Sequence, residues 1–221
     1  MENKNPMGRL MLITDSELFP DKESFLEGSK KALTGGVDTI QLREKTLSAR
    51  ELLCLAHELR KLTHKFRAKL IINERSDIAK LAEADGVHLP AAAFSAHDAR
   101  ALLGEKALIG VSAHSLGDAL SAEAGGADYV TLSPIYHTPS KAAYGEPIGL
   151  GPLAETTAEL KIPVYALGGI NKKRVKEVLH AGAAGVALIS AILCTGSPRE
   201  SARELADELI YYNNEKSKKA L

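Results

Sequence analysis

The chain has 221 residues, of which 45% are hydrophobic and 25% are charged, a composition typical of a globular protein with one substantial core. The 28 basic residues balance 28 acidic ones, so net charge points to neither nucleic acid nor an acidic membrane surface as a partner. Its two cysteines, Cys54 and Cys194, form no CxxC pair, and the sequence therefore suggests neither a disulfide framework nor a structural zinc site. Residues 1–9 lack the apolar stretch of a signal peptide, and no window approaches the roughly 20 apolar residues of a membrane span. We therefore expect a cytoplasmic protein. The sequence does not decide between a monomer and a homo-oligomer.

Short β-branched segments alternate with amphipathic ones at a period of about 25 residues, which is typical of parallel strands joined by helices. The predicted strands are, in chain order, residues 10–14, 37–43, 69–74, 86–89, 108–112, 129–133, 163–167 and 185–189. Between the second and third, Ala49–Phe66 carries an apolar stripe at spacings of three and four residues, as expected for a helix packed on a sheet. Several predicted helices end in glycine-containing stretches (34–38, 84–87, 125–129 and 181–186), where glycine suits the left-handed position that ends a helix.

Eight strand–helix units predict a single α/β domain over residues 1–221, a (β/α)8 TIM barrel with its core at about 9–213. The competing doubly wound sheet would have fewer strands. The active site of such barrels lies where the strands end, at the C-terminal rim, so polar residues at predicted strand ends are the candidates. The longest stretch without a predicted element, 137–149, follows the sixth strand, where a functional loop belongs.

The end of the second predicted strand carries two cations and an amide. Strand alternation sends Gln41, Arg43 and Lys45 to the same side. A planar guanidinium and a compact ammonium suit a phosphate or diphosphate. A surface ion-pair cluster with Glu44 as partner is an equally weighted alternative.

The last two predicted strands end in segments that resemble a barrel phosphate site. Gly168 and Gly169 let backbone N–H groups approach oxygens, and the chain after Ile189 and Ser190 supplies the second loop. The alternative is that the glycines only make a tight strand-to-helix turn. Phosphate binding is favoured because both loops agree and Asn171 can also cap the following helix.

The third and fifth strand ends carry candidates for metal binding and proton transfer. Asn73 and Glu74 offer oxygens to a hard cation such as Mg²⁺, whereas Asp77 fits better as an acid in the first turn of a helix. Ser112 and His114 end the fifth strand, and His114 is either a proton-transfer group or a structural imidazole bonded to a backbone carbonyl.

The loop after the sixth strand offers two hydroxyls and a third cation, Thr138, Ser140 and Lys141. Lys141 could neutralise a leaving anion, and a solvated loop lysine is the alternative.

Taken in order, these motifs resemble the thiamine phosphate synthase superfamily, which also contains the thiazole tautomerases. The matching segments span nearly the whole chain: Gln-Leu-Arg-Glu-Lys at 41–45, Ile-Asn-Glu-Arg at 72–75, Ala-Asp-Gly-Val-His-Leu at 84–89, Gly-Val-Ser-Ala-His at 110–114, Thr-Pro-Ser-Lys at 138–141, Leu-Gly-Gly-Ile at 167–170 and Leu-Ile-Ser-Ala-Ile at 188–192. Each motif alone is weak, but their order and spacing are specific to the superfamily.

The resemblance implies a transferase that couples 4-amino-5-hydroxymethylpyrimidine diphosphate to thiazole phosphate with magnesium, giving thiamine phosphate and pyrophosphate. It assigns the pyrimidine diphosphate to Gln41, Arg43, Lys45, Asn73, Ser112 and Lys141. It places Thr138 and Ser140 at the thiazole, and Gly168, Ile189 and Ser190 at its phosphate. Ser112, His114 and Lys141 are the candidate catalytic residues.

The chain departs from the family pattern at the expected metal site. Glu74 stands where synthases usually have Asp, and Ala93 replaces the usual second carboxylate, so Glu74 is the one predicted magnesium ligand. An isomerase of the tautomerase type, using His114, and a catalytically silent binder of thiazole phosphate or thiamine phosphate are therefore the alternatives to the favoured synthase.

Overall fold

The computed structural model describes residues 7–138 and 146–219, and it has eight parallel strands that close into a barrel in chain order. The strands are β1 (Leu10–Ile13), β2 (Thr39–Leu42), β3 (Lys69–Asn73), β4 (Gly86–Leu89), β5 (Leu108–Ala113), β6 (Tyr129–Leu132), β7 (Val164–Leu167) and β8 (Gly185–Leu188). The predicted (β/α)8 barrel is confirmed. Several strands end one residue earlier than predicted, because the chain leaves the strand ladder at Arg43, Glu74 and Ile189 to form the rim loops.

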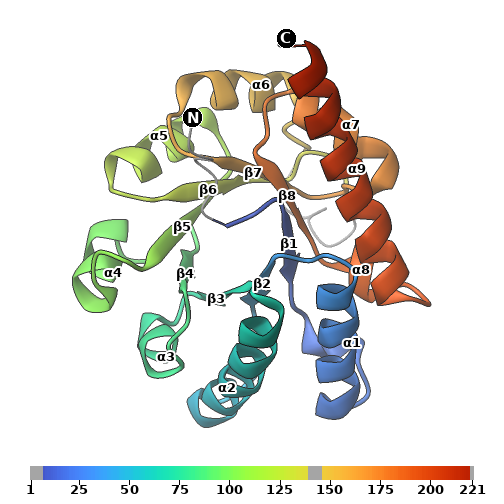
Figure 1. The fold of residues 1–221 in the computed structure, drawn as a ribbon. Coiled ribbons are helices and arrows are strands. Elements are labelled where there is room, and N and C mark those ends of the chain that lie inside the picture. Colours follow the sequence, from blue (N-terminus) through green and yellow to red (C-terminus); the bar gives the residue numbers. More distant parts are fainter. Residues whose placement is uncertain (1–6, 139–145, 220–221) are drawn as a thin grey trace.

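Helices surround the barrel as an outer ring, and α9 lies along α1 and α7 where the ring closes (Figure 1). They are η1 (Ser16–Leu18), α1 (Lys22–Thr34), α2 (Ala49–Phe66), α3 (Ser76–Leu81), α4 (Ala96–Leu103), α5 (Leu116–Ala124), α6 (Leu150–Glu159), α7 (Lys172–His180), α8 (Ser190–Leu193) and α9 (Pro198–Lys219). Within the described ranges, none of these helices combines the length and apolar character needed to cross a bilayer.

Helix α2 shows how sequence sets the outer layer. It begins at a capping box, in which Ser48 and Glu51 each accept a hydrogen bond from the other's backbone N–H. Its predicted stripe faces the sheet, with Leu52, Leu55 and Leu59 buried.

Two apolar layers hold the fold together, one between strands and helices and a smaller one inside the barrel. The inner layer includes Met7 from the segment that precedes β1. Tyr165 donates a hydrogen bond to the carbonyl of Gly8 at 2.7 Å, so this segment covers the N-terminal end of the barrel.

Three aspartates stabilise the N-terminal end of the barrel through the same kind of hydrogen bond. Asp38, Asp85 and Asp128 immediately precede β2, β4 and β6, and each accepts a hydrogen bond from the backbone N–H of the first or second residue of the preceding strand. Asp85 also pairs with Arg60 at 2.5 Å and with Lys69 at 3.0 Å, and Asp128 pairs with Arg100 at 2.7 Å. Before β8 the same position is Ala184.

The glycine stretches differ from expectation at one place. Gly36, Gly126 and Gly182 adopt the predicted left-handed conformation after their helices, with φ of 110°, 89° and 92°. In the stretch 84–87, however, Glu83 takes that role with φ 50°. Gly86 is instead required inside β4, because a Cβ there would lie 1.9 Å from the carbonyl oxygen of Leu108.

Candidate active site

The end of β2 brings Gln41, Arg43 and Lys45 to the C-terminal rim, with Gln41 buried, Arg43 half-buried and Lys45 exposed. Glu44 turns away from the two cations, because its carboxylate accepts hydrogen bonds from Thr14 Oγ1 at 2.6 Å and from Ser16 N at 3.0 Å. No ion pair joins Glu44 to Arg43 or Lys45 in the described part of the chain, so the alternative of a surface ion-pair cluster is wrong. The cations remain available to an anion.

Only one end of the Gln41 amide has a hydrogen-bond partner among the described residues. Its Nε2 donates to Asn73 Oδ1 at 3.4 Å, which joins the ends of β2 and β3. Its Oε1 is buried and accepts no hydrogen bond from any described residue. A buried acceptor without a donor is costly, so this oxygen favours a ligand that carries an N–H or O–H group.

Ser112 on β5 belongs to a buried polar network inside the barrel. His88 Nε2 lies 3.0 Å from Ser112 Oγ, and His88 Nδ1 lies 3.2 Å from the hydroxyl of Tyr129. Burial, and secondarily the charge of Arg43, lowers the pKa of His88 to about 3, so the imidazole is neutral at physiological pH. His88 is therefore structural, and it fixes the hydroxyl of Ser112 at the rim.

His114 is exposed and is oriented by its neighbours. Its Nδ1 lies 2.7 Å from the carbonyl oxygen of Ser133. A carbonyl only accepts, so Nδ1 carries the proton and Nε2 of the neutral ring is an acceptor. The hydrogen bond to a backbone carbonyl that a structural imidazole would make is therefore present. Nε2 of the neutral ring remains an acceptor, as proton transfer requires.

The end of β3 differs in how its two carboxylates are engaged. Asp77 forms a bidentate pair with Arg75, at 2.8 and 2.5 Å, in the first turn of α3, so it is the helix acid that the sequence favoured. Glu74 is exposed, and its backbone, with φ 64°, bends away from the strand while its N–H donates to the carbonyl of His88. Among the described residues no group of three potential metal ligands forms, and Ala93 sits in a turn closed by its N–H to the carbonyl of Pro90.

Gly168 and Gly169 follow β7 with φ of 101° and 64°. A Cβ on Gly168 would lie 2.9 Å from Pro134 Cα, and one on Gly169 would lie 2.7 Å from the carbonyl oxygen of His137, so only glycine fits this loop. Asn171 caps α7 as expected, since its side chain accepts from the N–H of Lys173 at 3.0 Å.

The chain after β8 supplies the second half of the predicted phosphate site. Ile189 is the N-cap of α8, and Ser190 begins the helix with an exposed side chain. The first N–H groups of a helix have no partner within the helix and favour an anion. Thr138 is half-buried beyond β6, whereas Ser140 and Lys141 lie outside the described residues.

Three residues near the rim were not predicted from sequence. Arg174 and Glu177 lie on α7 and interact with Tyr136, which follows β6. A charged residue on a helix gives no signal by itself, and only the fold shows that this helix begins beside the loop after β6.

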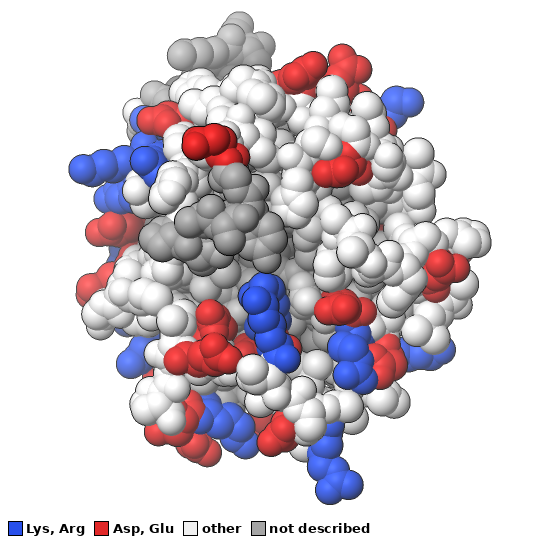
Figure 2. All heavy atoms as spheres, turned by 180° about the vertical axis from the view of Figure 1, so that it is seen from behind, with Lys and Arg blue, Asp and Glu red and all other residues white. Residues whose placement is uncertain are grey.

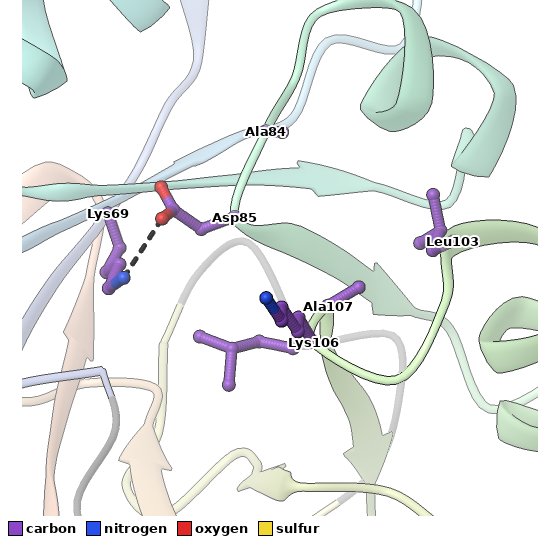
Figure 3. A pocket seen from close by; sticks show the side chains of 7 residues that line it. Lys69, Ala84, Asp85, Leu103, Lys106 and Ala107 are labelled. Carbon is purple, nitrogen blue, oxygen red and sulfur yellow. Dashed lines mark hydrogen bonds and ion pairs between the residues drawn. The ribbon is translucent and has the colours of Figure 1, made fainter.

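A hollow of about 440 Å³ opens at the opposite end of the barrel, between the starts of β3, β4 and β5 (Figure 3). Lys69 points at Asp85 there, and Arg60 engages the other carboxylate oxygen. Its carboxylate is thus already neutralised by protein groups. On the face drawn in Figure 2, opposite to the one seen in Figure 1, positive and negative side chains are interspersed, as their equal numbers suggest.

The comparisons with known proteins agree with this geometry. The profile of the thiamine monophosphate synthase family matches residues 10–192. The chain belongs to this family. It shares 55% identity over 198 residues with a relative from Geobacter sulfurreducens, covering 89% of this chain and 92% of that one. It shares 41% identity over 199 residues with the thiamine-phosphate synthase of Clostridium novyi, covering 90% and 97%.

Comparison with solved structures also supports membership of the thiamine monophosphate synthase family. The thiamine phosphate pyrophosphorylase of Pyrococcus furiosus superposes with a TM-score of 0.86 at 34% identity, over 95% of this chain and 98% of that one. A 3-hexulose-6-phosphate synthase superposes with a TM-score of 0.68 at 20% identity, a likeness of fold alone.

Proposed function

We propose that the protein is a thiamine phosphate synthase, which couples 4-amino-5-hydroxymethylpyrimidine diphosphate with thiazole phosphate and releases pyrophosphate. Family membership and relatives named thiamine-phosphate synthase support this transferase activity. The observation in the site that carries it is the end of β2. Among the described residues, its two cations form no ion pair and its buried amide oxygen accepts no hydrogen bond. A ligand with an exocyclic amine and a diphosphate answers both requirements.

The pyrimidine diphosphate would lie between β2, β3 and β5. Gln41 Oε1 would accept from its amino group, with the amide held by Asn73. Arg43 and Lys45 would bind the diphosphate, the first through two parallel hydrogen bonds and the second as a point charge. Ser112, held by His88, would donate to the same ligand.

The thiazole phosphate would lie on the other side of the rim. Backbone N–H groups around Gly168 and Gly169, and those that begin α8 after Ile189 and Ser190, would bind its phosphate. Thr138 and Ser140 would face the thiazole ring, as the family resemblance implies.

The proposed reaction exchanges one bond for another at the pyrimidine methylene carbon. The bond to the diphosphate oxygen breaks and pyrophosphate leaves with the electron pair, and the lone pair of the thiazole nitrogen then forms the new C–N bond. Arg43, Lys45 and Lys141 would stabilise the charge that develops on the departing diphosphate.

Magnesium fits this site with one protein carboxylate instead of the usual two. Glu74 is exposed at the rim and could hold the ion together with diphosphate oxygens, since Mg²⁺ commonly takes one or two protein carboxylates plus substrate phosphates. Bound there, the ion would neutralise diphosphate charge. Ala93 supplies no second carboxylate, so we expect weaker metal binding than the usual synthase pattern would give.

The test is to incubate the purified protein with both substrates, with and without Mg²⁺, and to measure thiamine phosphate. We expect magnesium-dependent product, and its absence under both conditions would contradict the proposal. Lys141→Ala should then abolish most of the activity. Lys106→Ala, which removes a lysine from the hollow at the opposite end, is the matched control and should leave it unchanged.

The same assay separates the alternative functions. His114 Nε2 is an acceptor in the neutral ring, which keeps an isomerase of the tautomerase type as the second candidate. Isomerisation of a thiazole phosphate carboxylate that is lost in His114→Ala, without coupling activity, would favour that isomerase. Ligand binding with turnover of neither substrate would favour a silent binding protein.

A further inference from the structure

The loop after β6 and the glycine loop after β7 lie against each other at the rim. Ile135 N donates to the carbonyl of Leu167 at 2.9 Å, and Tyr136 N donates to the carbonyl of Gly168 at 3.1 Å. A Cβ on Gly169 would lie 2.8 Å from Tyr136 Cβ, so the two segments touch without a gap. In the proposed function, one segment leads into Thr138 and the other binds the thiazole phosphate.

Three side chains join these segments from the outside, and we call them the Arg174 clasp: Arg174, Tyr136 and Glu177. Arg174 Nη1 donates to the carbonyl of Gly169 at 2.6 Å, and its guanidinium lies 4.2 Å from the centre of the Tyr136 ring. The Tyr136 hydroxyl donates to Glu177 Oε2 at 2.5 Å. One guanidinium therefore binds the glycine loop by a hydrogen bond and the neighbouring loop by a cation–π contact.

The clasp is chemically stable at physiological pH. Burial, together with the hydrogen bond to Glu177, raises the pKa of Tyr136 to about 12, so its phenol stays a donor. Arginine remains charged in proteins. The hydrogen bond from Tyr136 to Glu177 and the contacts of the Arg174 guanidinium are therefore kept at physiological pH.

Arg174 also fixes the direction of a backbone donor. In a trans peptide the carbonyl and the following N–H point in opposite directions. By binding the carbonyl of Gly169, Arg174 sets the orientation of the Ile170 N–H, which is the kind of donor that a phosphate loop uses. Gly169 has no side chain to limit its rotation, so this restraint matters more than at another residue.

We propose that Arg174 is a positioning residue for the thiazole phosphate: it touches no substrate, but it holds the glycine loop against the loop that leads to Thr138. This inference rests on the proposed function, because that function places thiazole phosphate here. Its consequence is selective. Loss of the clasp should weaken binding of thiazole phosphate and spare the pyrimidine diphosphate, which binds at β2, β3 and β5.

The experiment compares Arg174→Ala with Lys173→Ala, a matched control that removes an exposed cation one residue earlier on α7. Calorimetry measures the affinity of each protein for thiazole phosphate and for the pyrimidine diphosphate separately. We expect Arg174→Ala to lose about tenfold for thiazole phosphate, since misplacement by about 1 Å can cost a binding or catalytic group up to a hundredfold. Its affinity for the pyrimidine diphosphate and both affinities of Lys173→Ala should stay within about twofold.

Two further variants separate positioning from general damage. Tyr136→Leu should weaken thiazole phosphate binding like Arg174→Ala, and the double variant should lose little more, because the two residues act through one contact. Arg174→Lys, which keeps the charge but not the planar fork, should recover part of the affinity.

Unchanged thiazole phosphate affinity in Arg174→Ala, or equal losses for both substrates, would overturn the inference. Because binding is measured without turnover, the two proposals can fail independently. A wild-type protein that binds thiazole phosphate but forms no thiamine phosphate contradicts the synthase proposal alone.

Discussion

The two ends of the barrel carry similar charged residues and use them in opposite ways. At the N-terminal end, Asp85 and Asp128 are engaged by arginine, lysine and backbone N–H groups. At the C-terminal rim, Arg43, Lys45 and Glu74 form no ion pair with any described residue. Charges that are paired within the protein stabilise the fold, whereas charges left unpaired in a folded rim are available to a ligand. Substitutions at the two ends should therefore separate stability from activity.

The largest effect should come from the rim. We expect Arg43→Ala to lower kcat/KM for the pyrimidine diphosphate by about a hundredfold to a thousandfold, as for removal of a preorganised charge-stabilising donor. Its free energy of unfolding should stay within about 0.5 kcal/mol of wild type, because no described residue pairs with Arg43. Steady-state kinetics and urea unfolding measure the two quantities. The comparison would be contradicted if the free energy of unfolding fell by more than the loss in transition-state stabilisation calculated from kcat/KM.

Asp85→Ala should give the opposite result at the other end. The side chain is 16% exposed, and its removal leaves Arg60, Lys69 and the N–H of Leu70 without their common acceptor. We expect the free energy of unfolding to fall by about 2 kcal/mol, below the loss for a fully buried pair because of partial solvent screening. Values of kcat/KM per folded molecule, at a temperature where the variant is folded, should remain within about twofold.

The interior between the two ends should make stability depend on pH. His88 stays neutral when folded, with its pKa lowered from 6.5 to about 3, so the unfolded chain binds a proton that the folded chain does not. Stability should therefore fall as pH drops below 6.5, by about 1.5 kcal/mol at about pH 5.

Urea unfolding of wild type and His88→Gln across this range isolates the histidine. Asp38 acts in the opposite direction, because burial raises its pKa to about 6, so its contribution grows as pH falls through that value. The difference between wild type and variant cancels this contribution. The His88 assignment is wrong if both proteins lose stability equally on acidification.

The smallest effect should come from restoring the missing carboxylate. Ala93→Asp should raise coupling at limiting Mg²⁺ by about fivefold, equivalent to about 1 kcal/mol, because two carboxylates hold the ion better than Glu74 alone. Ala93→Asn provides a control of similar size without the charge. Equal activity of both variants and wild type across a Mg²⁺ titration would argue against a metal at this position.

The sequence predicts the barrel well because its information is local and repeated. Apolar strands, the α2 stripe and the glycine stretches recur in each unit, and the rim candidates follow from their positions at strand ends. Gln41 and Asn73 are candidates because each lies at a predicted strand end, and the structure joins them by a hydrogen bond.

What sequence alone missed depends on side-chain direction across long separations. Glu44 lies between two cations in the chain but turns to Thr14 and Ser16, so no spacing argument could assign its partner. The contact of Tyr136 with Arg174 crosses 38 positions of sequence and depends on the exact approach of two loops, which propensity does not encode.

The aspartates that precede β2, β4 and β6 divide the barrel into four quarters, and the last quarter has Ala184 at their position. That quarter contains the seam where the first and last strands meet. Arg9 spans it, donating to the carbonyls of Ala184 and Leu209 at 3.1 and 3.2 Å. Arg9 therefore closes the barrel between its last and first strands, whereas an aspartate joins the strands within each of the other quarters. A truncation that removes Arg9 should open the barrel at this seam.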